Sequence, residues 1–196
     1  MPTLARIVLV RHGETVGESR IRYFGSTDIE LSDEGRVQAN CARLAIPGVG
    51  FDRIVSSPLS RAWQTAMIVA RGRPIQLEHD FREVDFGFWE GLTADEIAER
   101  DPLPYAEWQR GGLDFVYPGG EARSDFRARV ERGLRRLAAR GDTESAIVVA
   151  HKGVVRTLAE LLTGETVARD QPALGGIVHA IRRADDRWHL GRRATL

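Results

Sequence analysis

The sequence lacks several features that would place it in another class of protein. It contains a single cysteine, Cys41, so no intrachain disulfide can form. Because Cys41 falls within a helical pattern, we expect it to be a buried, unreactive residue. The apolar run near the N-terminus is too short to span a membrane and leads directly into polar residues without a small-residue cleavage site. We therefore expect a cytoplasmic protein with no membrane association.

The chain also has no excess of charge of either sign. Lys plus Arg and Asp plus Glu each number 28, so the formal net charge is zero. A general nucleic-acid partner would require a basic excess or stripe, and neither is present. A few cationic groups can still converge on a small anion. The composition therefore favours a small-molecule ligand, and it favours no particular oligomeric state.

The 196 residues contain no low-complexity tract and are enough for one domain with a buried core. Continuous apolar runs at residues 7–10 and 147–149, and a shorter one at 53–56, are typical of strands buried on both faces. Residues 177–181 and 188–190 predict two strands nearer an edge. Helical patterns separate the strands. We therefore predict an α/β fold, a single-domain three-layer sandwich whose mostly parallel central sheet has helices on both faces.

The helices are predicted from caps and apolar spacing. The expected features are an N-cap at Ser32 followed by Val37, Cys41 and Leu44; Pro58 in the first turn of a helix that runs to Ala70; a capping box over residues 93–96; apolar spacing over 126–137; and a helix over 154–162 that ends at Gly164. Residues 101–122 are rich in Pro and Gly and contain Trp108, Phe115 and Tyr117. We expect them to form an insertion or lid of a single domain that covers residues 1–196.

Polar groups follow three of the predicted strands. Arg11 and His12 end the first, the second leads to Arg61, and His151 ends the last of the three. In open α/β sheets functional groups collect at the carboxyl ends of the strands. Two histidines and two arginines are therefore expected to meet at one edge of the sheet.

Such a cluster suits phosphoryl transfer, which depends mainly on positioning and on charge stabilisation. The arginine fork binds two oxygens at once and stays protonated. Positive neighbours keep a histidine neutral, which is its nucleophilic form. A glycine beside a histidine permits close approach of the backbone, so its amide can contribute to an anion site. A leaving oxygen also needs a proton donor, and carboxyl groups among aromatic rings are available at Glu83, Asp85 and Glu90.

Five segments in this order resemble the histidine phosphatase superfamily, which is also called the phosphoglycerate-mutase-like family. The segments are residues 11–15, residues 25–28 with 31–32, residues 56–62, Glu83 with residues 86–91, and His151. The resemblance covers nearly the whole chain. It implies that His12 becomes a phosphohistidine, that Arg11 and Arg61 bind phosphate, and that His151 completes the pocket. It also implies that Glu83 is the general acid and that no metal or cofactor is needed.

Three positions depart from the family pattern and predict a distinctive substrate rim. Glu18 stands where relatives often have an asparagine, Phe24 replaces a small or polar residue, and Lys152 replaces the glycine that commonly follows the second histidine. Lys152 could reach a second anionic group or could face solvent. These residues concern specificity and leave the predicted catalytic residues unchanged.

The expected activity is metal-independent hydrolysis of a small phosphomonoester. Three alternatives remain at this stage. Phosphoglycerate mutase activity is one, although 196 residues is short for an enzyme that excludes water with an insertion. An α-ribazole-phosphate phosphatase role is another, because residues 118–121 look like a segment of such enzymes and of sugar-bisphosphate phosphatases. The third is a phospho-ligand binding module without turnover.

Overall fold

A six-stranded sheet forms the centre of the molecule in the computed structural model, which describes residues 4–18, 20–46 and 50–191. Its strand order is β3-β2-β4-β1-β5-β6. The strands are β1 (Arg6–Arg11), β2 (Arg53–Ser56), β3 (Gln76–Leu77), β4 (Ser145–Ala150), β5 (Ile177–Arg182) and β6 (Trp188–Gly191). Strands β1 to β4 are parallel, whereas β5 pairs antiparallel with β1 and β6 pairs antiparallel with β5. The predicted mostly parallel sheet is confirmed, and the two-residue strand β3 was not expected.

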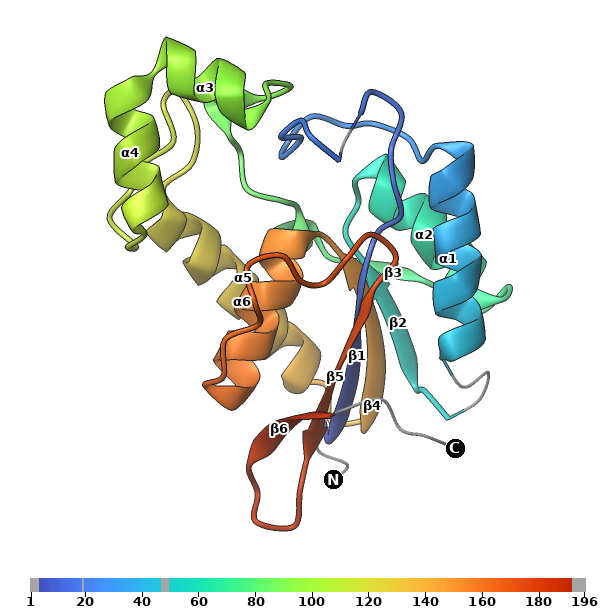
Figure 1. Cartoon of the computed structure of the whole chain (residues 1–196). Coiled ribbons are helices and arrows are strands. Elements are labelled where there is room, and N and C mark those ends of the chain that lie inside the picture. The colour runs from blue at the N-terminus through green and yellow to red at the C-terminus, as the bar shows by residue number, and fades with distance from the viewer. Residues whose placement is uncertain (1–3, 19, 47–49, 192–196) are drawn as a thin grey trace.

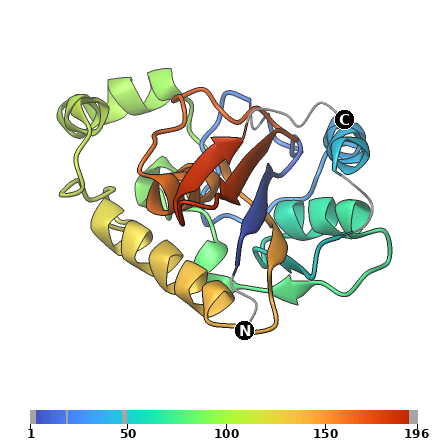
Figure 2. The same cartoon turned by 90° about the horizontal axis from the view of Figure 1, so that it is seen from below.

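Helices cover both faces of this sheet. The helices are α1 (Asp33–Ala45), α2 (Ser60–Ala70), α3 (Ala94–Arg100), α4 (Pro102–Arg110), α5 (Arg123–Ala138) and α6 (Lys152–Thr163), with 3-10 turns η1 (His79–Phe81) and η2 (Gly87–Trp89). Figures 1 and 2 show α1 and α2 on one face and α5 and α6 on the other, while α3 and α4 lie beyond one end of the sheet. The predicted three-layer sandwich is therefore confirmed. No helix of the described ranges is long and apolar enough to cross a membrane.

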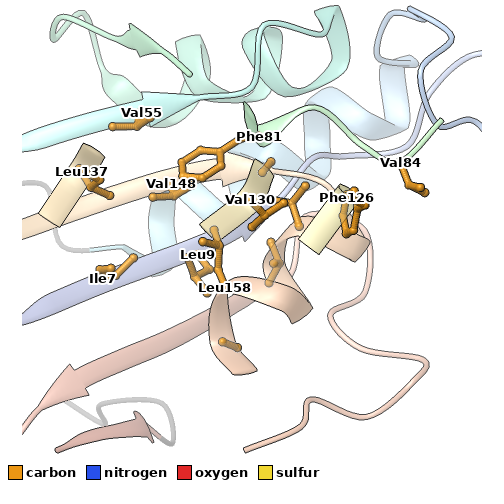
Figure 3. Close-up of a cluster of buried hydrophobic side chains, with 14 of the residues drawn as sticks. Ile7, Leu9, Val55, Phe81, Val84, Phe126, Val130, Leu137, Val148 and Leu158 are labelled. Atoms are coloured by element: carbon orange, nitrogen blue, oxygen red, sulfur yellow. The ribbon is translucent and has the colours of Figure 1, made fainter. Parts of the chain in front are cut away.

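The alternation of side chains along β1 explains why its whole run is apolar. Ile7 and Leu9 are buried in the core beneath α5 and α6, part of which Figure 3 shows. Val8 and Val10 are buried in a second core beneath α1 and α2. Successive strand residues point to opposite faces, so a central strand with helices on both sides needs apolar residues throughout.

Side-chain caps define several helix starts as predicted. The Ser32 side chain accepts a hydrogen bond from Gly35 N, and Thr93 and Glu96 form a reciprocal capping box. Caps of this kind stabilise a helix by about 1 kcal/mol. Gly164 ends α6 in the left-handed conformation, which glycine adopts without steric cost.

The buried face of α1 differs from the prediction. Its buried residues are Gly35, Ala39 and Ala42, whereas Val37 and Leu44 are 57% and 72% exposed. Cys41 is likewise exposed, so the prediction of a buried cysteine was wrong. The helical period was read correctly, but the small residues face inward because Gly35 packs directly against the backbone of residue 14.

Two further boundaries differ from the sequence reading. Pro58 precedes α2, which begins at Ser60 after an extended N-cap residue, Leu59. Within residues 101–122, the chain forms α4 with Pro102 in its first turn, a position where the missing proline N–H costs nothing. The aromatic residues of this segment pack together, since Trp108 Nε1 donates to the Tyr117 hydroxyl at 2.9 Å.

Candidate active site

The two histidines expected at the sheet edge lie side by side. The centroids of the His12 and His151 rings are 5.1 Å apart, with the planes inclined at 62°. The pairing of β1 with β4 explains this, because Arg11 lies opposite Ala150 at the ends of parallel strands. The strand-end rule therefore places these two residues correctly from the sequence.

A cavity of about 310 Å³ opens at this edge. Arg11, His12, Arg61 and Glu83 line it, and His151 lies behind His12 with no exposed surface. We call these five residues the inner group. The structure thus brings together all the residues for which the sequence predicted a catalytic or phosphate-binding role.

A backbone contact sets the proton position on His12. Its Nδ1 lies 2.6 Å from the carbonyl oxygen of Gly13. A carbonyl oxygen only accepts hydrogen bonds, so Nδ1 carries the proton of the neutral ring and Nε2 keeps its lone pair. Burial lowers the pKa of His12 well below its usual value, and the charges of Arg61 and Arg11 lower it further. The ring is therefore neutral near pH 7.

His151 is also held neutral and is oriented by a serine. Burial lowers its pKa well below the usual value, with Arg61 as the next cause. Its Nε2 lies 2.8 Å from Ser57 Oγ, and the same oxygen accepts a hydrogen bond from Leu59 N. Nδ1 of His151 has no partner among the residues described. That nitrogen remains available for a further hydrogen bond.

Among the described residues, the two arginines of the inner group are held by carbonyl oxygens and by no carboxylate. Arg61 donates to the carbonyl oxygens of Thr27 at 2.8 Å and Gly25 at 2.6 Å, and Arg11 donates to that of Pro172 at 2.9 Å. Nε of each is buried and has no partner within the described ranges. Both guanidinium groups are thus fixed in position while their charge remains uncompensated by an ion pair.

Glu83 is fixed by two backbone amides. Its Oε1 accepts from Val84 N and its Oε2 accepts from Gly153 N, each at 3.0 Å. A Cβ on Gly153 would lie 2.5 Å from Glu83 Oε1, so only glycine permits this approach. Only 8% of the residue is exposed, and it lines the same cavity as His12.

Arg129 supports the segment that carries Glu83, and the sequence reading did not identify it. Its side chain donates to the carbonyl oxygens of Asp80, Arg82 and Glu83 at 2.6–2.9 Å and pairs with Glu121 at 2.7 Å. Glu121 belongs to the Pro-Gly-Gly-Glu segment that the sequence singled out. Hydrogen bonds from a side chain to backbone carbonyl oxygens distant in sequence do not depend on residue type at the acceptor. The sequence therefore gives no sign of this role of Arg129.

The other two carboxylates of this region make structural contacts. Glu90 accepts hydrogen bonds from the backbone amides of Gly25, Ser26 and Thr27, and so ties residues 25–27 to its own loop. Asp85 accepts from Gly87 N and from the Ser26 hydroxyl. Across residues 4–18, 20–46 and 50–191, no group of three or more His, Cys, Asp or Glu side chains is arranged to hold a metal ion.

The glycines beside the histidines have a different use from the one expected. Gly13 N donates to Thr65 Oγ1 at 3.3 Å, and Gly153 N donates to Glu83, so neither amide is free for an anion. A Cβ on Gly13 would lie 2.2 Å from the carbonyl oxygen of Gly35. These glycines permit close packing of the protein on itself.

The predicted rim residues divide into two sets. Phe24 and Lys152 line the cavity, whereas Glu18 is not among its lining residues and pairs with Arg22 at 3.3 Å. The sequence reading missed several lining residues, namely Arg20, Arg22, Tyr23, Arg156 and Arg169. Since Lys and Arg together number 28, nothing in the sequence distinguishes these arginines from those on the surface.

The chain is similar to proteins named as phosphatases. The profile of the histidine phosphatase superfamily, branch 1, matches residues 7–193. The adenosylcobalamin/α-ribazole phosphatase of Salmonella typhimurium is 35% identical over 161 residues, which cover 81% of this chain and 80% of that protein. The structure of a mycobacterial glucosyl-3-phosphoglycerate phosphatase superposes with a TM-score of 0.77 at 31% identity, covering 95% of this chain and 96% of the other.

A bifunctional protein of Mycobacterium tuberculosis is 37% identical over 163 residues. The match covers 81% of this chain but 44% of that protein, so the chain spans less than half the length of this relative. Together with the superfamily match, these similarities confirm the family resemblance found in the sequence.

Proposed function

Because the chain belongs to the histidine phosphatase superfamily, we propose that it hydrolyses a small phosphomonoester through a phosphohistidine on His12. One observation carries this proposal. Two guanidinium groups that contact backbone carbonyl oxygens and form no ion pair among the described residues, those of Arg11 and Arg61, lie beside a neutral imidazole in one cavity. A dianionic phosphoryl group requires this combination of a nucleophile and fixed positive charge.

In the first step, His12 Nε2 attacks phosphorus in line with the ester oxygen. The N–P bond forms as the P–O bond to the leaving group breaks, and Nδ1 keeps its proton on the Gly13 carbonyl oxygen. Arg11 and Arg61 stabilise the charge on the phosphoryl oxygens. His151 lies beside His12, and its Nδ1, which has no partner among the residues described, provides a further hydrogen-bonding group for these oxygens.

Glu83 transfers the proton in both steps. In its protonated form it gives the proton to the leaving oxygen, which departs as an alcohol. The resulting carboxylate then takes a proton from water as the water oxygen attacks phosphorus and the N–P bond breaks. Inorganic phosphate leaves, and His12 and protonated Glu83 are regenerated. The arginines provide the positive charge throughout, so the proposed reaction needs no metal ion.

Residues 101–122 form the lid of this site in the proposal, within one domain that covers residues 1–196. Trp108 of α4 lies 5.8 Å, between ring centroids, from Tyr23, a cavity-lining residue. The guanidinium carbon of Arg169, also in the lining, lies 5.1 Å from the centroid of the Trp108 ring. These contacts link the segment to the cavity wall and support a role in substrate selection.

A specific candidate activity is the hydrolysis of α-ribazole phosphate. The similarity to the Salmonella typhimurium enzyme favours it. It differs from the general proposal only in the leaving group, so the same assay can test both.

The direct test is phosphate release from a panel of phosphomonoesters, with and without EDTA. p-Nitrophenyl phosphate serves as the generic substrate, α-ribazole phosphate as the specific one, and 3-phosphoglycerate is assayed for mutase activity in parallel. The proposal predicts release that resists the chelator. Complete inhibition by EDTA, or mutase activity without hydrolysis, would contradict it.

A further inference from the structure

The cavity contains more positive charge than one phosphoryl group requires. Seven cationic side chains line it, against the single carboxylate of Glu83; they are Arg11, Arg20, Arg22, Arg61, Lys152, Arg156 and Arg169. The formal net charge of the whole chain is zero. The local excess therefore does not follow from a generally basic composition.

Ion pairs compensate two of these cations. Arg20 pairs with Glu14, and Arg22 pairs with Glu96 at 2.9 Å and also with Glu18. Arg11 and Arg61 belong to the proposed phosphoryl site. Three cations remain, Lys152, Arg156 and Arg169, and none of them makes an ion pair within the described part of the chain. We call these three residues the outer cations.

Two of the outer cations lie on one helix, and all three have few contacts. Lys152 and Arg156 lie four residues apart on α6, so they share one helix face. Arg156 Nε donates to the carbonyl oxygen of Val167 at 3.3 Å, and Arg169 stacks on Trp108. These contacts orient the two arginines while their charges stay uncompensated. Among the described residues, the amine of Lys152 makes no hydrogen bond.

The crowding of like charges is visible at Lys152. Burial lowers the pKa of its amine, and the charges of Arg11 and Arg156 lower it further, against the opposing fields of Asp170 and Glu83. Keeping several cations together in a half-buried cavity is unfavourable, and a bound anion would relieve that repulsion. The wall of the same cavity also includes apolar side chains, among them Ile21, Phe24 and Phe86.

We infer that the outer cations bind a second anionic group of the substrate, a carboxylate or a second phosphoryl group. The preferred substrate is then a phosphomonoester whose organic part lies against the apolar wall and carries this second anion. α-Ribazole phosphate has no second anionic group, so the inference predicts that it is a poorer substrate than such an ester. The inference rests on the proposed function, because it assigns the first phosphoryl group to the inner group.

Alkyl phosphates with different terminal groups test the inference. Three series of increasing chain length end in a hydroxyl, a carboxylate or a phosphonate, and the phosphonate cannot itself be hydrolysed. At one or more chain lengths, the charged series should exceed the hydroxyl series in kcat/KM by about tenfold or more, as a charge-assisted contact would give. Comparison of the carboxylate with the phosphonate identifies which anion is preferred.

Substitutions show which side chains cause the preference for charged substrates. Lys152→Gln and Arg169→Gln should each reduce the ratio of kcat/KM between the charged and the hydroxyl substrate by at least several-fold. Arg135→Gln is the matched control, because Arg135 is an exposed arginine of α5 that pairs with Glu131. It removes the same charge far from the cavity lining and should leave the ratio unchanged. An equal drop in all three variants would overturn the local assignment.

A binding measurement tests the same point without turnover. Lys152 is the single lysine in the sequence, so acylation by an amine reagent can be followed on its peptide apart from the N-terminal amine. An alkylphosphonate with a terminal carboxylate should protect Lys152 from acylation, whereas the same compound with a terminal hydroxyl should protect it much less.

The outcomes separate the inference from the proposed function. Hydrolysis of p-nitrophenyl phosphate with no discrimination among terminal groups at any length, and equal protection of Lys152, would overturn the second-anion site and leave the phosphatase mechanism intact. No hydrolysis of any ester, with selective protection of Lys152 by the carboxylate compound, would overturn the mechanism and retain the site.

Discussion

The inner group and the outer cations lie in one cavity but are held in different ways. His12, Arg61, Glu83 and His151 are at most 8% exposed, and backbone groups or a neighbouring serine fix each of them. Lys152, Arg156 and Arg169 have at most one hydrogen bond or ring contact each with the residues that the structure describes. Catalysis requires the reacting groups to be held in fixed positions, and the inner group is held by more contacts than the outer cations. The inner group is thus assigned to the reaction and the outer cations to substrate specificity. Variants of the two regions should therefore have effects of different kinds.

The largest effect is expected at the nucleophile. His12→Gln removes the atom that accepts the phosphoryl group, so kcat should fall by about 10⁴-fold or more. His79→Gln provides the control, because His79 is exposed and not in the cavity lining. Phosphate release is measured for both variants, with circular dichroism to verify folding. Substantial turnover by a folded His12→Gln protein would show that His12 is not the nucleophile.

Glu83→Gln should produce a loss that depends on the leaving group. For alkyl phosphates, whose leaving oxygen needs a proton, kcat/KM should fall by roughly 10²–10⁴-fold. For p-nitrophenyl phosphate the loss should be much smaller, because this leaving group departs readily as an anion. The matched control is Glu99→Gln on the exposed face of α3, outside the cavity lining. Equal losses for the two substrate classes would show that Glu83 is not the acid.

Arg61→Lys affects both regions of the cavity, because Arg61 belongs to the inner group and also holds the segment that carries Phe24. Lysine keeps the charge but cannot donate to the carbonyl oxygens of Thr27 and Gly25 while also binding phosphate with a planar fork. We expect a decrease in kcat/KM of about 10- to 100-fold and weaker inhibition by inorganic phosphate. Wild-type inhibition constants would argue against a phosphate contact.

The two buried histidines predict a decrease in stability in weak acid. Their pKa values in the folded protein lie well below the usual 6.5, chiefly because of burial. Between those values and pH 6.5 the unfolded chain binds protons that the folded chain does not. Their contribution to stability is therefore complete above pH 6.5 and decreases as the pH falls below it, by up to about 1.4 kcal/mol per pH unit for each histidine.

Denaturant unfolding of the wild type and of His12→Gln between pH 7.5 and 5 measures this effect. The free energy of unfolding should depend less steeply on pH in the variant. Parallel curves for the two proteins would mean that His12 is not held neutral by the fold.

The smallest effect is expected at Phe24, which lines the cavity outside the inner group. Phe24→Leu keeps an apolar side chain, so kcat should change by less than about twofold and KM by a few-fold, depending on the organic part of the substrate. A large loss of kcat with every substrate would show that the wall acts on the chemistry and would remove the distinction between the two regions.

Several residues of the inner group could be predicted from the sequence because the end of a buried apolar run marks the end of a strand. The apolar runs that became β1 and β4 are followed directly by His12 and His151, and the strand-end rule brings them together. Choosing Glu83 over Asp85 and Glu90 depended on the family resemblance. The structure agrees with this choice in placing Glu83, and neither of the others, in the cavity lining.

The surroundings of these residues could not be predicted in the same way. The Arg129 contacts join side chain to backbone across 46 residues or more, and a backbone carbonyl has no sequence identity. The buried face of α1 was misread because apolar spacing favoured Val37 and Leu44, whereas close packing selected Gly35 and Ala39. Arg169 lies in an irregular segment after α6, where its position follows from tertiary contacts alone.

Trapping the phosphorylated enzyme shows whether His12 becomes a phosphohistidine during turnover. Glu83→Gln should accumulate this intermediate with p-nitrophenyl phosphate, since transfer to His12 needs little acid assistance while its hydrolysis needs the base. After a rapid alkaline quench and digestion, mass spectrometry should find one phosphoryl group on the peptide that contains His12, labile to acid and absent in His12→Gln. Phosphate release with no phosphorylated peptide, or a phosphoryl group on another residue, would contradict the assignment of His12 as the nucleophile.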